Sequence, residues 1–129
     1  MTPSNISHDF YSEKISPFND SKQKDDNGDM NGMSAKLLKS RTVIISQQVN
    51  SELSAKVLNQ LVLLEQEDPK QGITVFINSP GGEIFSGFAI FDMLKFIECP
   101  ITTVVTGFAA SMGSVFSLAA DEGRRFAMP

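Results

Sequence analysis

The chain has 129 residues, of which 41% are hydrophobic and 20% charged, a composition typical of a soluble globular protein. This length suits one domain with a modest core and is too short for two. The net charge of −4 at pH 7 disfavours a nucleic-acid partner, and the basic groups Lys36–Lys39–Arg41 and Arg124–Arg125 are interpreted as solvated rims.

Residues 1–34 are predicted to form a flexible polar tail. Their Ser, Asn, Asp and Lys side chains bury too little apolar surface to offset the entropy of ordering. The tail has no apolar stretch after a basic start, so no secretory signal is expected and the expected location is cytoplasmic. The globular domain is expected to span residues 35–129.

From Thr42 onward, strand-like and helix-like patterns alternate. Runs of β-branched residues predict strands, and leucines at three- and four-residue spacing predict a helix that Asn50 or Ser51 can cap. This alternation predicts an α/β fold with right-handed crossovers and a mainly parallel sheet. The predicted strands cover residues 42–45, 73–77, 101–106 and 125–128, and the predicted helices cover 50–67, 84–97 and 114–120. The helix of residues 84–97 is expected to bury the face formed by Ile84, Phe88, Phe91 and Leu94 or Met93.

The uncharged stretch 101–120 is as long as a membrane span. Its threonines, serines and glycines favour a strand, a turn and a short helix instead, so no membrane partner is expected. Cys99, the only cysteine, cannot form an internal disulfide and is predicted to be a small buried side chain.

The first candidate site is the turn Asn78-Ser79-Pro80-Gly81-Gly82, which follows the strand of residues 73–77. Pro80 fixes one backbone angle, while the two glycines tolerate left-handed conformations and a close approach of another backbone. The alternative is a plain strand-to-helix turn. A phosphate-binding loop fits poorly, because the chain lacks both glycine-rich nucleotide fingerprints, and no cofactor is expected.

The second candidate site is the turn Gly107-Phe108-Ala109-Ala110-Ser111-Met112-Gly113. Its Ala-x-Ser-x-Gly pattern resembles a nucleophile elbow, which exposes a serine where a strand turns into a helix. The Met112 amide would then be a natural donor to an oxyanion. The alternative is that Ser111 only caps the helix. Ligands bind beyond the carboxyl ends of parallel strands, so both turns are expected on one rim of the sheet.

A general base for Ser111 is missing from the sequence. The only histidine, His8, belongs to the polar tail, and Lys95 is expected near the far end of its helix, away from the rim. The turns therefore predict only half of an acyl-transfer site.

Several motifs in register resemble the proteolytic subunit of the ATP-dependent Clp protease. The resemblance covers Ala35 to Pro129 and includes the 29-residue step from Gly82 to Ser111. It implies a crotonase-like fold of repeated β-β-α units, incomplete at its C-terminus. The segments that carry it are Leu37–Ile44, Ile77–Gly82, Gly107–Gly113 and Arg124–Pro129.

The resemblance also implies roles for individual residues. Ser111 would be the nucleophile of a serine endopeptidase, and the amides of Gly82 and Met112 would form the oxyanion hole. The substrate backbone would pair with the stretch Gly81, Gly82, Glu83, Ile84 and Phe85. Phe76 and Phe96 would lie near pockets where an unfoldase docks, with core packing as the alternative.

In that family, subunits assemble into seven-membered rings stacked in pairs. An AAA+ unfoldase, which is the partner that uses ATP, feeds unfolded polypeptides into them. The resemblance implies no cofactor or metal in the chain itself.

The departures from the family pattern lie at the two ends of the chain. The family's catalytic histidine and acid follow the motif that ends here at Pro129, as does a long helical handle. The chain is therefore interpreted as a fragment or truncated product, inactive alone, with an uncovered sheet edge and apolar face. The alternatives are a non-catalytic ring component or assembly modulator and, more remotely, an acyl-CoA enzyme of the crotonase type with Glu83 as its acid or base.

Overall fold

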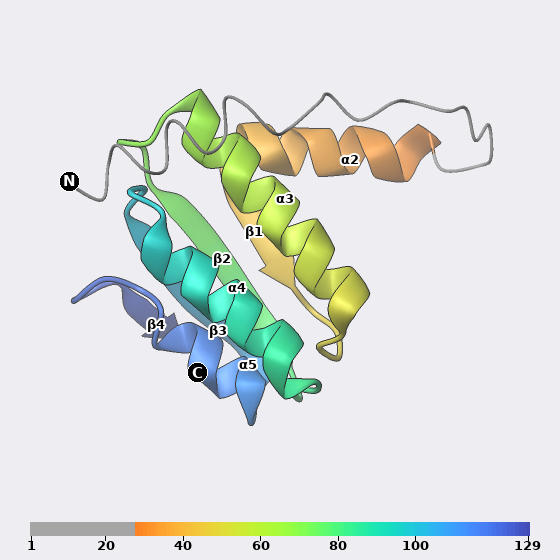
Figure 1. Ribbon diagram of the computed structural model, residues 1–129, viewed down its shortest axis with the longest axis vertical. Helices are drawn as coiled ribbons and strands as arrows, with labels where there is room; N and C mark the ends of the chain where they lie inside the picture. The colour runs from red at the N-terminus through yellow and green to blue at the C-terminus, as the bar shows by residue number, and fades with distance from the viewer. Residues whose placement is uncertain (1–27) are drawn as a thin grey trace.

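The structure is a computed structural model that describes residues 28–129 (Figure 1). Helices and strands alternate along the described chain, as the sequence predicted. Their order is α2 (Gly28–Lys39), β1 (Thr42–Ile45), α3 (Ser51–Glu67), β2 (Ile73–Ser79), α4 (Ile84–Phe96), β3 (Ile101–Ala109), α5 (Met112–Ser117) and β4 (Arg125–Ala127).

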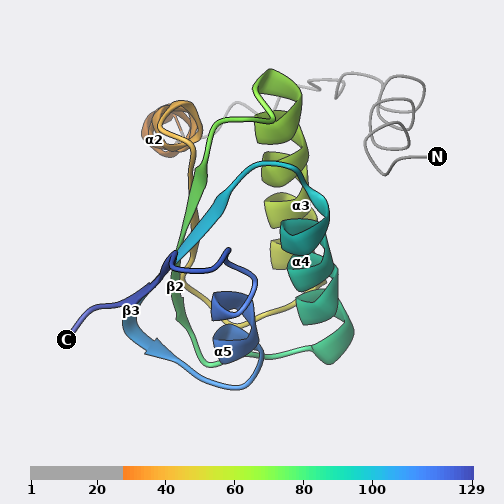
Figure 2. The ribbon, with the colours of Figure 1, turned by 90° about the vertical axis from the view of Figure 1, so that its left-hand side faces the viewer.

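The four strands form one sheet in the order β1-β2-β3-β4, and every neighbouring pair is parallel. The predicted α/β fold with a parallel sheet is therefore confirmed. Right-handed crossovers that always advance in the same direction place their helices on the same face of a sheet. Accordingly, α3, α4 and α5 lie on one face, whereas α2 lies apart from them beside β1 (Figure 2).

The core lies between the sheet and these three helices. Helix α3 begins as predicted at Asn50, whose side chain accepts a hydrogen bond of 2.8 Å from the Leu53 N–H. The leucine and valine positions at helical spacing are all buried in it. They meet alternate residues of the strands, which is the pattern of a sheet with one covered face. The members of this core from α3, β1 and β2 are Leu53, Val57, Leu61, Leu64, Val43, Ile45, Ile73, Val75 and Ile77.

The buried face of α4 was predicted only in part, because Leu94 is buried and Phe91 and Met93 pack against the core as expected. Ile84 and Phe88 are exposed, and the buried residues are Gly87, Ile90 and Leu94. Apolar residues occur on every side of this helix, so its sequence does not single out one face. Gly87 lies close against the Met112 side chain, so the side of α4 that carries Gly87 faces α5.

Some element boundaries also differ from the prediction. Helix α2 begins at Gly28, so residues 28–34 are helical although they were assigned to the tail, and α5 begins at Met112 instead of residue 114. Strand β3 runs beyond Thr106 because its register with β2 shifts between Ile77 and Ser79. Residues 1–27, which include His8, lie outside the described part of the chain. No helix among the described residues is long and apolar enough to cross a membrane.

The position of Arg41 was also predicted wrongly. It was expected at a solvated rim, but its side chain is buried and the residue is only 5% exposed. Its guanidinium group donates to the backbone carbonyls of Gly72, Gln71 and Asp68 at 3.2, 3.1 and 2.9 Å. These bonds tie the start of β1 to the loop between α3 and β2. The adjacent thiol of Cys99 is buried as predicted, and burial raises its pKa.

The face of the sheet that points away from α3, α4 and α5 carries a row of apolar side chains. Cross-strand pairing aligns Ile44 with Phe76, Phe76 with Val104, and Val104 with Phe126. Ile44 and Phe126, at its two ends, are 45% and 55% exposed. We call this set the open-face row. It matches the expectation of an uncovered apolar face.

Candidate active site

The two glycine-containing turns follow neighbouring strands and meet at one rim of the sheet, as predicted. The last residue of β2, Ser79, pairs with Ala109 at the end of β3. Just beyond this pair, the backbone of Gly81 lies against the second turn. A Cβ atom placed on Gly81 would come within 2.8 Å of the Ser111 Cβ and 2.9 Å of the Met112 nitrogen. The space beside the serine and the following amide is therefore open only because residue 81 has no side chain.

Ser111 has a strained backbone conformation and a free-standing side chain. Its φ of 52° and ψ of −126° are rare for a residue other than glycine. Its side chain makes no capping hydrogen bond to α5, although it occupies the N-cap position. It is exposed at the rim. The capping alternative is thus not supported, and the sharp strand-to-helix turn has the geometry of a nucleophile elbow.

The two amides predicted for the oxyanion hole are not used by the surrounding backbone structure. Met112 is the first residue of α5, so its N–H has no acceptor within the helix. Gly82 forms a parallel β-bridge with Val49, but the two hydrogen bonds of this bridge are made by the residues on either side of Gly82. The Val49 N–H donates to the Gly81 carbonyl at 2.8 Å, and the Glu83 N–H donates to the Val49 carbonyl at 2.9 Å. Gly82 itself directs its N–H and carbonyl away from Val49.

Comparison with known protein families gives a match that covers the whole globular part of the chain. The sequence profile of the Clp protease family matches residues 24–129. The chain belongs to the Clp protease family. It is similar to a protein of Deinococcus radiodurans named ATP-dependent Clp protease proteolytic subunit, with 41% identity over 95 residues, covering 74% of this chain and 47% of that protein.

Two further relatives bear the name ATP-dependent Clp protease proteolytic subunit 1. The protein of Chlamydia muridarum is 52% identical over 94 residues, covering 73% of this chain and 49% of its own length. The protein of Protochlamydia amoebophila is 52% identical over 93 residues, covering 72% of this chain and 45% of its own length. The chain thus spans about half the length of the curated relatives that it matches.

The stretch predicted to bind the substrate backbone in this Clp protease family member is only partly extended. Gly81, Gly82 and Glu83 precede α4, whereas Ile84 and Phe85 already form its first turn. The backbone N–H and carbonyl groups of Gly81 and Glu83 are already hydrogen-bonded within the chain, so only Gly82 has both groups available for pairing with a substrate. The side chain of Phe85 is 90% exposed beside them. The Glu83 carboxylate accepts a hydrogen bond of 2.7 Å from the Ser86 hydroxyl, so it is already engaged with the first turn of α4.

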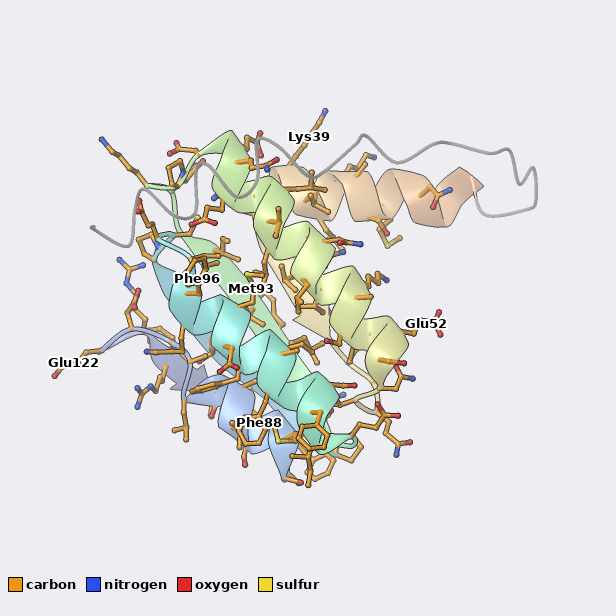
Figure 3. All side chains as sticks on the ribbon, in the orientation of Figure 1. Lys39, Glu52, Phe88, Met93, Phe96 and Glu122 are labelled. Carbon is orange, nitrogen blue, oxygen red and sulfur yellow. The ribbon has the colours of Figure 1, made fainter. Side chains whose placement is uncertain are left out.

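Phe76 and Phe96, the predicted docking residues, are not brought together within one chain. Phe76 is part of the open-face row, while Phe96 is 50% exposed at the last turn of α4, which covers the other face of the sheet. Figure 3 shows Phe96 at the opposite end of this helix from Phe88. Neither phenylalanine belongs to the buried core. Their role in docking stays a prediction.

The described residues contain no histidine, and His8 lies outside them. Lys95 lies in the last turn of α4, at the opposite end of this helix from the glycine turn. Residues 28–129 hold no group of three or more His, Cys, Asp or Glu side chains that could bind a metal ion. The site therefore contains a serine and two amide donors, with no histidine base from the described part of the chain.

Ser79 is the site residue that sequence reasoning missed. It is completely buried, and its carbonyl accepts a hydrogen bond of 3.1 Å from the Ala110 N–H in the second turn. A Cβ on Gly113 would collide with the same carbonyl. The available signal was its position in the strand, because Ser79 continues the alternation of buried residues Ile73, Val75 and Ile77 with a polar side chain.

Proposed function

We propose that the chain supplies the nucleophile and the oxyanion hole of a serine endopeptidase subunit in an ATP-dependent Clp-type protease. The observation that carries this proposal is the contact between Gly81 and the strained, uncapped Ser111. It supports the proposal because the Met112 N–H and the Gly82 N–H, next along the chain from Gly81, have no acceptor in the surrounding backbone structure. Membership of the Clp protease family agrees with this chemistry.

In the proposed mechanism, Ser111 Oγ attacks the carbonyl carbon of a substrate peptide bond. The amides of Gly82 and Met112 donate to the oxygen on which negative charge develops, and one such donor contributes about 100- to 1,000-fold to the rate. A histidine from outside the described residues takes the serine proton and delivers it to the leaving amine as the C–N bond breaks. Water then hydrolyses the acyl-enzyme ester.

The proposed substrates are unfolded polypeptides, which present an extended backbone. Gly82 turns its N–H and carbonyl away from Val49, and an extended chain could use both groups in the manner of an added strand. A folded substrate could not reach this rim segment with its backbone. This requirement agrees with a partner that unfolds the substrate first.

The proposed assembly is a seven-membered ring, single or stacked in pairs, on which a cytoplasmic AAA+ unfoldase docks and hydrolyses ATP. The open-face row supports the existence of a partner, because Ile44 and Phe126 at its ends are about half exposed and α3, α4 and α5 all lie on the opposite face of the sheet (Figure 2). Phe76 in this row and Phe96 on α4 are the proposed docking residues. The two lie on opposite faces, so a single pocket would need two neighbouring chains.

The test is active-site labelling of the assembly in which the chain occurs naturally, with a fluorophosphonate that reacts with activated serines. We expect Ser111→Ala to abolish labelling and peptide hydrolysis. We expect Ser117→Ala to leave both intact, because Ser117 ends α5 and its hydroxyl donates only to the Ser114 carbonyl. Labelling that persists in Ser111→Ala would refute the mechanism.

A second candidate is a non-catalytic ring component, in which no base activates Ser111. It predicts that the chain enters mixed rings with a complete relative but that Ser111 takes no label in them.

A further inference from the structure

Ser79 lies at the point where the two turns and a third segment of the chain meet. It is 0% exposed, and its hydroxyl donates to the Gln47 carbonyl at 2.7 Å. The same oxygen accepts the Gly81 N–H at 3.2 Å. Gln47 belongs to the loop between β1 and α3, so this one hydroxyl joins that loop to the glycine turn.

The backbone of Ser79 makes the corresponding connection to the nucleophile turn. Its carbonyl accepts the Ala110 N–H at 3.1 Å, directly before Ser111. Gly113 packs so closely on this carbonyl that no side chain fits there. The glycine turn is therefore held by the Ser79 side chain and the serine turn by its backbone.

From these contacts we propose that Ser79 is a positioning residue, which fixes the Gly82 amide relative to Ser111 and thereby sets the geometry of the oxyanion hole. This inference rests on the proposed function. Without the hydroxyl, the Gly81 N–H and the Gln47 carbonyl lose their shared buried partner, and the glycine turn keeps only its backbone bonds to Val49 as a link to the loop between β1 and α3. The serine turn keeps its backbone contacts, so the loss loosens the Gly82 amide relative to Ser111.

Such a loss affects the transition state more than the bound substrate, because the oxyanion exists only in the former. We expect Ser79→Ala to lower kcat for a peptide substrate by about tenfold, the effect of roughly one lost hydrogen bond. We expect KM to stay within about twofold. The affinity for a peptide boronate, which forms a tetrahedral adduct with the serine, should weaken by about the same factor as kcat.

The matched control is Thr103→Val. Thr103 is also 0% exposed, and its hydroxyl donates to a backbone carbonyl, that of Ser117 at 3.0 Å, without touching either turn. It should lower the melting temperature yet leave kcat and boronate affinity unchanged. Ser79→Cys, which keeps the volume and a weak donor, should lie between wild type and Ser79→Ala. If Ser79→Ala does not fold, the kcat and boronate affinity of Ser79→Cys test the positioning role instead.

All measurements are made on the natural assembly, together with Ser111→Ala. Equal effects of the Ser79 and Thr103 variants on kcat, or a change in KM alone, would overturn the positioning role while leaving Ser111 as the nucleophile. Full turnover in Ser111→Ala would instead overturn the proposed function, and the role of Ser79 with it.

Discussion

The Cα of Gly81 faces the side chain of Ser111 so closely that a single methyl group cannot fit between them. A Cβ on Gly81 would stand 2.8 Å from the Ser111 Cβ and 3.0 Å from the Ala110 carbonyl oxygen. Gly81 also has a φ of 92°, in the region that disfavours side chains. Backbone conformation and steric contact thus both require glycine here.

These two requirements can be separated by comparing Gly81→Ala with Gly123→Ala. Gly123 has a similar φ of 76°, but nothing lies within 4 Å of the position of its Cβ. We expect Gly123→Ala to lower the free energy of unfolding by about 1 kcal/mol, the cost of the left-handed conformation. Gly81→Ala should cost about 2–4 kcal/mol, because overpacking adds to that cost. Urea denaturation measures both values, and equal losses would mean that the turn yields without strain.

A similar pair tests the contact between α5 and Ser79. Gly113→Ala places a methyl group against the Ser79 carbonyl and should lower the free energy of unfolding by about 1–3 kcal/mol. Gly32, inside α2, has nothing within 4 Å of its Cβ position. Gly32→Ala should therefore raise the free energy of unfolding by about 0.5–1 kcal/mol, since alanine favours helices. Opposite signs in urea denaturation are the expected result.

Much of the fold was predictable from local patterns. Thr42–Ile45 is a run of β-branched residues, the α3 leucines have a clear helical spacing, and Asn50 has the side chain that its capping role needs. The approach of the two turns followed from the parallel order of the strands alone. For these features, local sequence and tertiary structure favour the same answer.

The features that were missed depend on contacts between distant segments. The buried side of α4 includes Gly87, whose close contact with Met112 no periodicity within α4 can reveal. The burial of Arg41 depends on three carbonyls about thirty residues further along the chain. Polar residues such as Arg41 and Ser79 are usually exposed, so only their partners explain why they are not.

The buried guanidinium of Arg41 gives a further stability prediction. Arg41→Lys keeps the charge but loses the planar donor geometry that reaches three carbonyls, and should lower the free energy of unfolding by about 3 kcal/mol. Arg125→Lys is the control, because Arg125 is exposed and makes two longer bonds of 3.3 Å to the carbonyls of Leu118 and Ala120. It should change stability by less than about 0.5 kcal/mol. A small effect at Arg41 in urea denaturation would show that its hydrogen bonds are replaced by water.

The buried thiol of Cys99 should make the stability of the protein depend on pH. Burial raises the pKa of its thiol above the ordinary 9.0, the Glu65 charge raises it further, and the Arg41 charge opposes both. Above pH 9.0 the unfolded thiol ionises while the folded one keeps its proton, so this contribution to stability is lost as pH rises. We therefore expect the difference in the free energy of unfolding between wild type and Cys99→Ala to shrink between about pH 8 and pH 10. A difference that grows over this range would contradict the sign.

The consecutive strand order also bears on how the molecule is synthesised. Each strand pairs with the one that left the ribosome just before it, so no pairing has to wait for a distant part of the chain. Gly82 and Ser111 are separated only by α4 and β3, and closing so short a loop costs little entropy. The proposed nucleophile and its proposed amide donors can therefore come together on the nascent chain soon after α5 emerges.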